Sequence, residues 1–504
     1  MADPVGFGRA CGRRPRRRRN EETEVMPVDH YSTATAMLAA LRSGEVSSLE
    51  LTEAHIARIE ALDGPLNAIP VHTFDRARDM ARAADARIAA GETAPLLGLP
   101  MTLKESTLTA GLPQSAGIEA FRDHRPERDG PIARVVFDAG IALLGKTNIP
   151  VALGDWQADS PVYGRANNPW DLERTPGGST GGGGAALAAG LTPLEVGSDI
   201  GGSIRVPAAY CGVFGHRPTE TAIPRTGAFP LADQPNPTAL MGVQGPLARS
   251  AADLELLFDV LAGPEEGEDV AWQLQLPPPR ARKLSELRIA LCPPLPGLAP
   301  AKAVRDAMDR LAGALADEGA QVDAPALPFD FEAYFTDYLR LLSVMVNQGL
   351  PAEERAALAT RLREAQDPIA SAQADGLVMD AAGYIALANR RAAAQAAWRG
   401  FFADWDLVVA PMVPDVAFPH QSAPFQERRL VIDNEEVSYW LNIVYPMLAI
   451  FTGLPSTAFP AGLSEAGLPV GLQAIGPYLE DRTPLAFARA MEARGWAFSP
   501  PPGY

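Results

Sequence analysis

The sequence predicts an α/β protein in which helices cover a central β-sheet. Short apolar runs that end at glycine or proline have the length and composition of buried strands, at residues 97–103, 141–144 and 194–196. Helical segments lie between them, at 130–139 and 184–189. The chain has 504 residues, of which 47% are hydrophobic and 21% charged, the composition of an ordinary globular protein. Strands that alternate with helices in such a chain indicate one helix-covered sheet.

Helical periodicity also appears before these strands, in residues 34–42, 48–62 and 74–90. In the second of these segments Leu49, Ile56 and Ile59 fall on one face. A stretch rich in proline and charge at 264–286 is typical of a surface linker.

The remaining elements continue the pattern to the end of the chain. Residues 330–403 are rich in Ala, Arg, Leu and Glu and have almost no strand signal, which predicts a helical insertion that covers a pocket. The other segments are a strand at 287–291, a helix at 300–318, strands at 406–410 and 469–475, and a last helix at 483–494. We therefore expect a single domain over residues 29–504.

The charge balance disfavours several classes of protein. The chain has 61 acidic and 44 basic residues and a net charge of -17, which argues against non-specific binding to nucleic acid. No run approaches the roughly 18 apolar residues of a membrane span. Cys11, Cys211 and Cys292 lie too far apart to indicate a metal site or a disulfide framework. These features are typical of a reduced, cytoplasmic protein.

The N-terminus differs in charge from the rest of the chain. Arginines crowd residues 13–19, but the polar residues 20–24 follow where a twin-arginine signal needs an apolar stretch. We therefore expect residues 1–28 to be a basic, disordered extension.

Residues 140–147 match the phosphate-loop pattern G-x-x-x-x-G-K-[ST]. The pattern requires a flexible loop followed by a helix, whereas Ile-Ala-Leu-Leu in its centre favours a buried strand, and Pro150 opposes a helix. A nucleotide site at 140–147 is the weaker interpretation, and Lys146 is better explained as structural.

A second segment, residues 176–184, holds six glycines around Ser179 and Thr180. Its Gly177-x-Ser179-x-Gly181 spacing matches a hydrolase nucleophile elbow, but the preceding residues 167–175 are polar rather than a buried strand. A dinucleotide-binding loop fails for the same reason. So many glycines let the backbone approach another group closely.

A third segment, residues 197–207, follows the strand at 194–196. Gly201 and Gly202 leave nearby backbone N–H groups unobstructed beside Ser203, as in an oxyanion hole. A plain glycine-rich loop is the alternative.

A serine nucleophile needs a base. His216 or His420 could be the base of a Ser-His-Asp triad, but the sequence marks no acidic residue as the partner of either histidine. Lysine can serve if burial lowers its pKa from about 10.4 toward 7–8. The chain has four lysines, Lys104, Lys146, Lys283 and Lys302. Lys104 ends the apolar strand at 97–103, and arginine could not replace it as a base because a guanidinium does not release its proton.

The strand that ends at Lys104 and the two glycine-rich segments around Ser179 and Ser203, in this order along the chain, resemble the amidase-signature family of serine hydrolases. Residues 98–105 resemble its G-x-P-x-x-x-K-[DE] strand, 176–182 its G-G-S-S-G-G stretch, and 197–209 its G-x-D-x-G-G-S-[IV]-R-x-P-A-x core. Further similarity, at 144–148, 167–170, 211–215, 453–456 and 467–477, extends the resemblance over about residues 30–500. It implies the family's fold, a mixed sheet covered by helices.

The resemblance also implies roles for individual residues. Ser203 would be the nucleophile, Ser179 the proton relay after a cis Gly178–Ser179 peptide bond, and Lys104 the base. The backbone N–H groups of Ile200, Gly201, Gly202 and Ser203 would form the oxyanion hole. Asp199, Arg205, Thr180 and Gly178 would support them. No metal or cofactor is expected. Thr180 replaces the usual serine, and Ile200 stands where threonine is frequent.

We predict a hydrolase of small amides with apolar or aryl groups, for which esters and carbamates (urethanes) are also plausible substrates. The candidates for the pocket wall are Trp156, Tyr163, Trp170, Tyr439, Trp440, Tyr445 and the helix at 335–349.

An alternative in the same family is the amidase subunit of a glutamine-dependent tRNA amidotransferase, although Val206 stands where those subunits usually have glutamine. A binding protein without catalytic activity would be expected to lack Ser203 or Lys104. The only partner expected is the small substrate, and a homodimer is compatible with the sequence.

Overall fold

A computed structural model describes residues 1, 28–230 and 240–504 of the chain. The basic extension predicted for residues 1–28 lies, apart from its two end residues, outside the described part. Within the described ranges, no helix combines the length and the apolar composition needed to cross a bilayer. No group of three or more His, Cys, Asp or Glu side chains there is arranged to hold a metal ion.

The centre of the molecule is one mixed sheet of eleven strands, as predicted. The strand order is β1-β3-β2-β4-β6-β5-β12-β13-β9-β7-β8. Strand β2 pairs in parallel with β3 and β4, and β7 pairs in parallel with β8 and β9, whereas the other neighbours are antiparallel. The strands are β1 (Val71–His72), β2 (Pro100–Lys104), β3 (Ala142–Thr147), β4 (Leu194–Asp199), β5 (Phe214–Arg217), β6 (Val243–Ala248), β7 (Arg288–Leu291), β8 (Gln321–Asp323), β9 (Leu407–Pro411), β12 (Ser456–Leu463) and β13 (Pro469–Ile475). A separate hairpin comprises β10 (Arg429–Ile432) and β11 (Glu435–Ser438).

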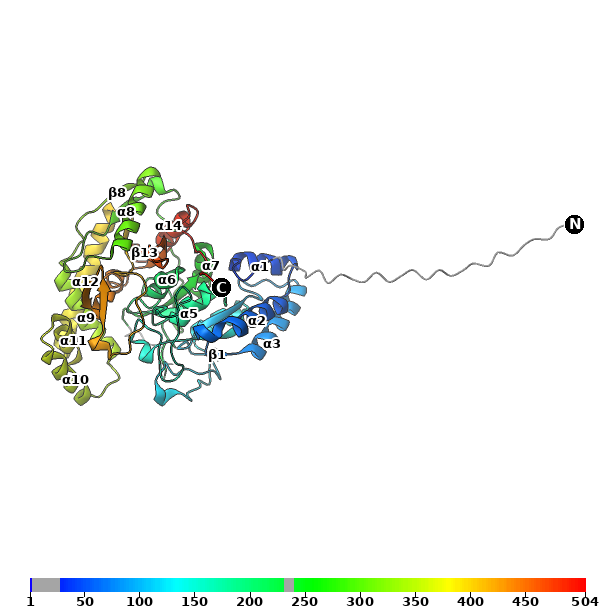
Figure 1. Ribbon diagram of the computed structural model, residues 1–504, viewed down its shortest axis with the longest axis horizontal. Coiled ribbons are helices and arrows are strands. Elements are labelled where there is room, and N and C mark those ends of the chain that lie inside the picture. Colours follow the sequence, from blue (N-terminus) through cyan, green and yellow to red (C-terminus); the bar gives the residue numbers. More distant parts are fainter. Residues whose placement is uncertain (2–27, 231–239) are drawn as a thin grey trace.

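The helices of the first half of the chain run from α1, α2 and α3 at one end of the molecule to α5, α6 and α7 near its centre (Figure 1). They are α1 (Ala34–Ser43), α2 (Ser48–Leu66), α3 (Phe74–Ala89), α4 (Pro131–Asp138), α5 (Gly181–Ala188), α6 (Arg205–Cys211) and α7 (Ala251–Leu261). Helix α2 begins with a capping box, in which Ser47 Oγ accepts from Glu50 N and Glu50 Oε2 accepts from Ser47 N. Leu49, which was expected on its buried face, is only half-buried, whereas Leu51, Ile56 and Ile59 are buried.

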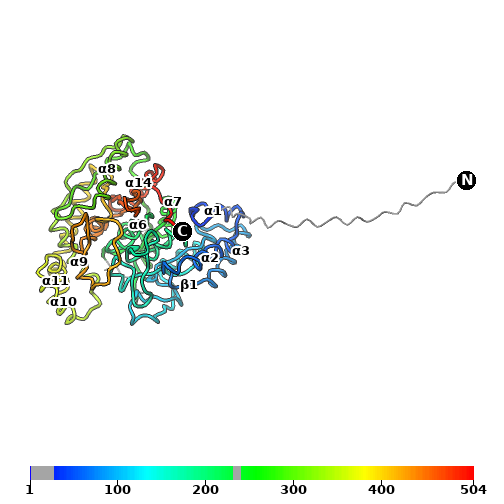
Figure 2. Tube along the Cα trace, in the orientation of Figure 1, coloured from blue at the N-terminus to red at the C-terminus, as the bar shows by residue number. Residues whose placement is uncertain are grey.

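The helices of the second half include the predicted insertion, here α9 to α12. They are α8 (Lys302–Asp317), α9 (Phe331–Val346), α10 (Ala352–Glu364), α11 (Pro368–Leu377), α12 (Ala381–Asp404), α13 (Met447–Ile450) and α14 (Arg482–Glu492). Helices α9, α10 and α11 lie at the end of the molecule opposite α1, α2 and α3 (Figure 2). The linker predicted at 264–286 forms no long element, only the short 3₁₀ turn Leu284–Glu286.

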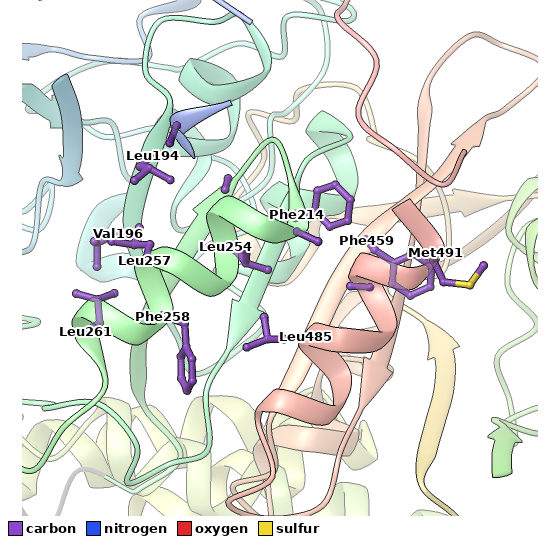
Figure 3. Close-up of a cluster of buried hydrophobic side chains, with 14 of the residues drawn as sticks. Leu194, Val196, Phe214, Leu254, Leu257, Phe258, Leu261, Phe459, Leu485 and Met491 are labelled. Carbon is purple, nitrogen blue, oxygen red and sulfur yellow. The ribbon is translucent and has the colours of Figure 1, made fainter. Parts of the chain in front are cut away.

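One part of the core joins distant segments of the chain. Figure 3 shows α7 and α14 placing apolar side chains against strands β4, β5 and β12. Each of these side chains is at most 1% exposed: Leu194, Val196, Phe214, Leu254, Leu257, Phe258, Leu261, Phe459, Leu485 and Met491. This packing fixes β4, whose carboxyl end carries the third glycine-rich segment.

The phosphate-loop interpretation of residues 140–147 is wrong. Residues 142–147 form the buried strand β3 rather than a loop. Lys146 is fully buried, and its Nζ donates to the carbonyl oxygens of Thr107 and Pro113. Lys146 therefore holds the segment after β2 in place, which is a structural role.

Candidate active site

Lys104 is the last residue of β2, at the edge where the parallel strands β2, β3 and β4 end together. Its side chain is 1% exposed. Nζ donates to Ser179 Oγ at 2.7 Å and to Ser198 Oγ at 2.9 Å. The structure thus brings Lys104 and Ser179 together from segments 75 residues apart.

Burial controls the protonation of Lys104. It lowers the pKa of the amine to about 7, and the nearby carboxylates of Asp199, Glu195 and Glu105 limit this decrease. An amine with a pKa near 7 is neutral in a large fraction of molecules at neutral pH, as a general base must be.

Glu195 is a fully buried carboxyl group next to this lysine. It lies on β4 opposite Thr102 of β2. Its Oε2 accepts from Thr102 Oγ1 at 2.5 Å, and its Oε1 accepts from Thr147 Oγ1 at 2.7 Å. Burial raises the pKa of Glu195 to about 7, although both threonine hydroxyls favour the charged form.

Ser179 lies in the turn that precedes α5, and the Gly178–Ser179 peptide bond is cis. The glycines of this segment allow close packing. A Cβ on Gly177, which has φ 88°, would lie 2.8 Å from Pro207 Cα, and one on Gly183 would lie 2.6 Å from Glu195 Cγ. Close backbone approach therefore explains the glycine-rich composition seen in the sequence.

Ser203 lies in the turn between β4 and α6 and is 6% exposed. The N–H of Thr180 donates to the carbonyl oxygen of Ser203 at 3.1 Å, which joins this turn to the turn of Ser179. Thr180 Oγ1 is buried and has no hydrogen-bond partner among the described residues.

The expected oxyanion hole needs one revision. Gly202 N donates to Asp199 Oδ1 at 3.1 Å, so this N–H is already engaged. Within the described chain, the N–H groups of Ile200, Gly201 and Ser203 donate no backbone hydrogen bond. These three amides are the better candidates for binding an oxyanion.

Two buried arginines hold the Ser203 turn through Asp199. Arg205 donates to both carboxylate oxygens of Asp199, at 3.0 and 3.2 Å, and Arg217 donates to its backbone carbonyl at 2.8 Å. Burial acts to raise the pKa of Asp199, but the two arginines outweigh it and lower the pKa to about 2. Asp199 is therefore a permanent anion that also accepts from the N–H groups of Gly202 and Ile204.

Two aromatic residues orient the peptide groups of this turn. Tyr338 OH donates to the carbonyl oxygen of Ile200 at 3.1 Å, and Trp156 Nε1 donates to that of Gly201 at 2.9 Å. In a trans peptide the C=O and the following N–H point in opposite directions. The bond from Tyr338 therefore fixes the direction of the Gly201 N–H.

A cavity of about 650 Å³ lies between the helical insertion and the segment around the β10–β11 hairpin. Helix α9 lines it through Leu342, Ser343 and Val346, and Asn347 directly after the helix also lines it. Lys104, Ser179 and Ser203 do not line it. It approaches their turns through Asp155, whose backbone packs against Gly178, and through Trp440, whose ring contacts that of Trp156 at 5.9 Å.

Of the aromatic candidates for the pocket wall, Trp440 lines this cavity. Trp156 and Tyr439 pack behind it, with their ring centroids 5.2 Å apart. Tyr163 donates to Glu105, Trp170 donates to the carbonyl oxygen of Cys211, and Tyr445 is 2% exposed. These last three are packing residues rather than part of the cavity wall.

His216, for which no acidic partner is evident in the sequence, has one in the structure. Its Nε2 lies 3.2 Å from Asp481 Oδ1 and its Nδ1 lies 2.9 Å from Thr457 Oγ1. All three residues are fully buried, and burial lowers the pKa of His216. The group resembles a triad in composition, but no substrate can reach its hydroxyl.

Several residues that contact the predicted site were not predicted from the sequence. Ser198 lies inside the third motif and was open to identification from its position. Glu195 could also have been identified from the sequence, because a charged residue interrupts an otherwise apolar strand. Tyr338 and Arg217 could not, since their contacts depend on the tertiary fold.

Comparison with known proteins identifies the family. The family model described as Amidase matches residues 50–485. An indoleacetamide hydrolase of Bradyrhizobium diazoefficiens is 32% identical over 471 residues, which cover 93% of this chain and 87% of the relative. A glutamyl-tRNA(Gln) amidotransferase subunit of Methylococcus capsulatus is 31% identical over 94% of this chain and 99% of its own length. The crystal structure of a bacterial aryl acylamidase superposes with a TM-score of 0.75 at 26% identity, covering 92% of this chain and 96% of that one. The chain therefore belongs to the amidase-signature family of amide hydrolases.

Proposed function

We propose that the protein hydrolyses small amides with an apolar or aromatic acyl or amine group, through an acyl-enzyme on Ser203. The proposal rests on the buried hydrogen bond of 2.7 Å between Lys104 Nζ and Ser179 Oγ. Lys104 has a pKa near 7 and is hydrogen-bonded to Ser179, whose turn is joined to the turn of Ser203 by a backbone hydrogen bond. This arrangement supplies a base and a relay without histidine.

In the proposed mechanism, Ser203 Oγ attacks the substrate carbonyl carbon and passes its proton to Ser179, which passes its own proton to neutral Lys104. The N–H groups of Ile200, Gly201 and Ser203 stabilise the oxyanion. The relay then runs in reverse and protonates the leaving nitrogen, so the C–N bond breaks. Water attacks the ester of Ser203 with the same relay as base, which releases the acid.

The cavity supports the choice of substrate. Leu342, Val346, Leu358, Leu362, Leu377, Phe425 and Trp440 give it a largely apolar wall. Such a wall favours alkyl or aryl groups. The similarity to a bacterial aryl acylamidase and to an indoleacetamide hydrolase agrees with aromatic amides. Esters and carbamates have the same attacked carbonyl, and we include them in the proposal.

The decisive experiment measures kcat/KM for an anilide, a primary amide, an ester and a carbamate. We expect Ser203→Ala to lose about 10³-fold or more on every substrate that is cleaved. Lys104→Ala should lose more on the anilide than on an activated ester, because an amine must be protonated to leave. Lys302→Ala is the matched control, since Lys302 is an exposed lysine paired with Asp306.

Near wild-type turnover by Ser203→Ala would reject Ser203 as the nucleophile. Equal losses on anilide and ester in Lys104→Ala would reject the relay.

A second candidate is the amidase component of a tRNA-dependent amidotransferase, because one such protein matches over almost its full length. Such a site must hold the α-ammonium and α-carboxylate of glutamine. Three charged residues line the cavity, namely Asp155, Asp159 and Arg428. Arg428 pairs with Asp155, to which Tyr439 OH also donates, so the cation of the cavity is already engaged. Measuring ammonia release from glutamine tests this candidate directly, and turnover above that of the anilide would favour it over the first.

A further inference from the structure

Gln373 of α11 is a buried polar side chain in the wall of the cavity. The residue is 8% exposed, and no donor among the described residues reaches its Oε1. Leucine side chains from three helices surround the same part of the cavity: Leu342, Leu358, Leu362 and Leu377. A buried amide in apolar surroundings is destabilising unless it is hydrogen-bonded. Neighbouring atoms cover the oxygen itself, so the amide must rotate toward the cavity to meet a ligand there.

Three other polar side chains of the cavity have partners within the protein. Asn347 Nδ2 donates to the carbonyl oxygen of Ser343 at 2.9 Å, and Gln426 Oε1 accepts from Trp440 Nε1 at 3.1 Å. Arg428 is paired with Asp155. Gln373 differs from these residues because its amide oxygen lacks such a partner in the described part of the chain.

The position of Gln373 is fixed by close packing of two helices. Ser343 Oγ of α9 donates to the backbone carbonyl of Gln373 at 2.8 Å. Three residues further along α11, a Cβ on Gly376 would lie 2.7 Å from Ser343 Cβ, so the helices are in close contact here. A rigid backbone keeps Gln373 in the cavity wall, so a ligand has only the side-chain torsions of this residue to order.

We propose that Gln373 determines specificity by binding a neutral polar group at the end of the substrate remote from the reacting carbonyl. The inference rests on the proposed function, in which this cavity receives the substrate. An amide offers both donors and an acceptor and carries no charge, so it matches a second carboxamide or a hydroxyl group. The bound group is remote from Ser203 because Ser203 does not line the cavity, and the rings of Trp440 and Trp156 connect the cavity wall to the Ser203 turn.

The test uses pairs of anilides whose acyl tails end either in a carboxamide or in a methyl group, at several tail lengths. We expect wild type to favour the carboxamide by about tenfold in kcat/KM at the best length, mainly through KM. Gln373→Met keeps the size of the side chain and removes both hydrogen-bonding groups. It should bring the ratio to about one while retaining turnover of the methyl-ended substrate. Gln348→Met, at an exposed position outside the cavity, is the matched control and should keep the wild-type ratio.

A second variant guards against misfolding as an explanation. Gln373→Glu should shift the preference toward a tail that ends in an ammonium group. An equal kcat/KM for both tails in wild type, or a ratio unchanged in Gln373→Met, would overturn the inference and leave the proposed function intact. Absence of Ser203-dependent turnover of any anilide would instead reject the proposed function, and with it the inference.

Discussion

The hydroxyl of Tyr338 donates a hydrogen bond of 3.1 Å to the carbonyl oxygen of Ile200, at the start of the turn that carries Ser203. Tyr338 lies on α9, in the helical insertion, whereas Ile200 directly follows strand β4 of the central sheet. The insertion therefore contributes to the cavity wall and also orients a peptide group beside the proposed nucleophile.

We predict that Tyr338→Phe lowers kcat by about tenfold with little change in KM. Without the hydroxyl, the peptide that carries the Gly201 N–H loses its fixed direction, which weakens a donor to the oxyanion. Direct removal of such a donor costs about 10²–10³-fold, so an indirect effect should be smaller. Tyr384→Phe, on α12 and outside this contact, should keep wild-type kcat. A wild-type kcat in Tyr338→Phe would show that Gly201 is held by other contacts.

The pH dependence of wild type should report the protonation of Lys104. Burial lowers the pKa of this lysine to about 7, and only the neutral amine accepts a proton. Activity should therefore be low at acidic pH and rise through about pH 7. The measurement is kcat/KM for the anilide between about pH 5 and 9, since this ratio reports the free enzyme. An acid limb near pH 4 would point to a carboxylate as the base.

In the pH profile of kcat/KM, Glu195→Gln should move the rise that is expected near pH 7 to lower pH by about one unit. The negative charge of Glu195 stabilises protonated Lys104 and so raises its pKa, and an uncharged amide removes that effect. Glutamine has nearly the same shape and still accepts a hydrogen bond from Thr102 or Thr147. The profiles of Glu195→Gln and of Glu60→Gln, at an exposed control position, should be compared. An unchanged limb would mean that the carboxyl of Glu195 is already neutral in the resting enzyme.

Much of the site could be predicted because its chemistry is local in the sequence. The apolar run that ends at Lys104 is observed as strand β2, and the two glycine-rich segments are observed as turns before α5 and α6. In each case a short motif sets both the backbone shape and the reactive side chain.

The parts that escaped prediction depend on distant contacts. Strand β6 contains Gly245 and Pro246, which weaken any strand signal, yet it pairs with β4 along six residues. The resemblance to the family implied that the N–H of Gly202 belongs to the oxyanion hole. Only the folded chain shows that the carboxylate of Asp199 accepts from it.

The helical insertion is joined to the catalytic body by a buried ion pair between Arg391 of α12 and Glu220, and its loss should destabilise the protein. Arg391 Nε also donates to the carbonyl oxygen of Phe451 at 2.6 Å, and Glu220 Oε2 accepts from Met241 N at 2.9 Å. Arg391→Met leaves a buried carboxylate without its cation, which should lower the free energy of unfolding by about 3–5 kcal/mol.

Arg363 of α10 is the matched control, because it pairs with Asp375 and both side chains are about half-exposed. Arg363→Met should cost no more than about 1 kcal/mol, since solvent screens the pair. Chemical denaturation of both variants gives the comparison. Adding Glu220→Gln to Arg391→Met should recover part of the loss, because the uncompensated charge is then removed. Equal losses in the two single variants would show that the buried pair contributes no more than a surface pair.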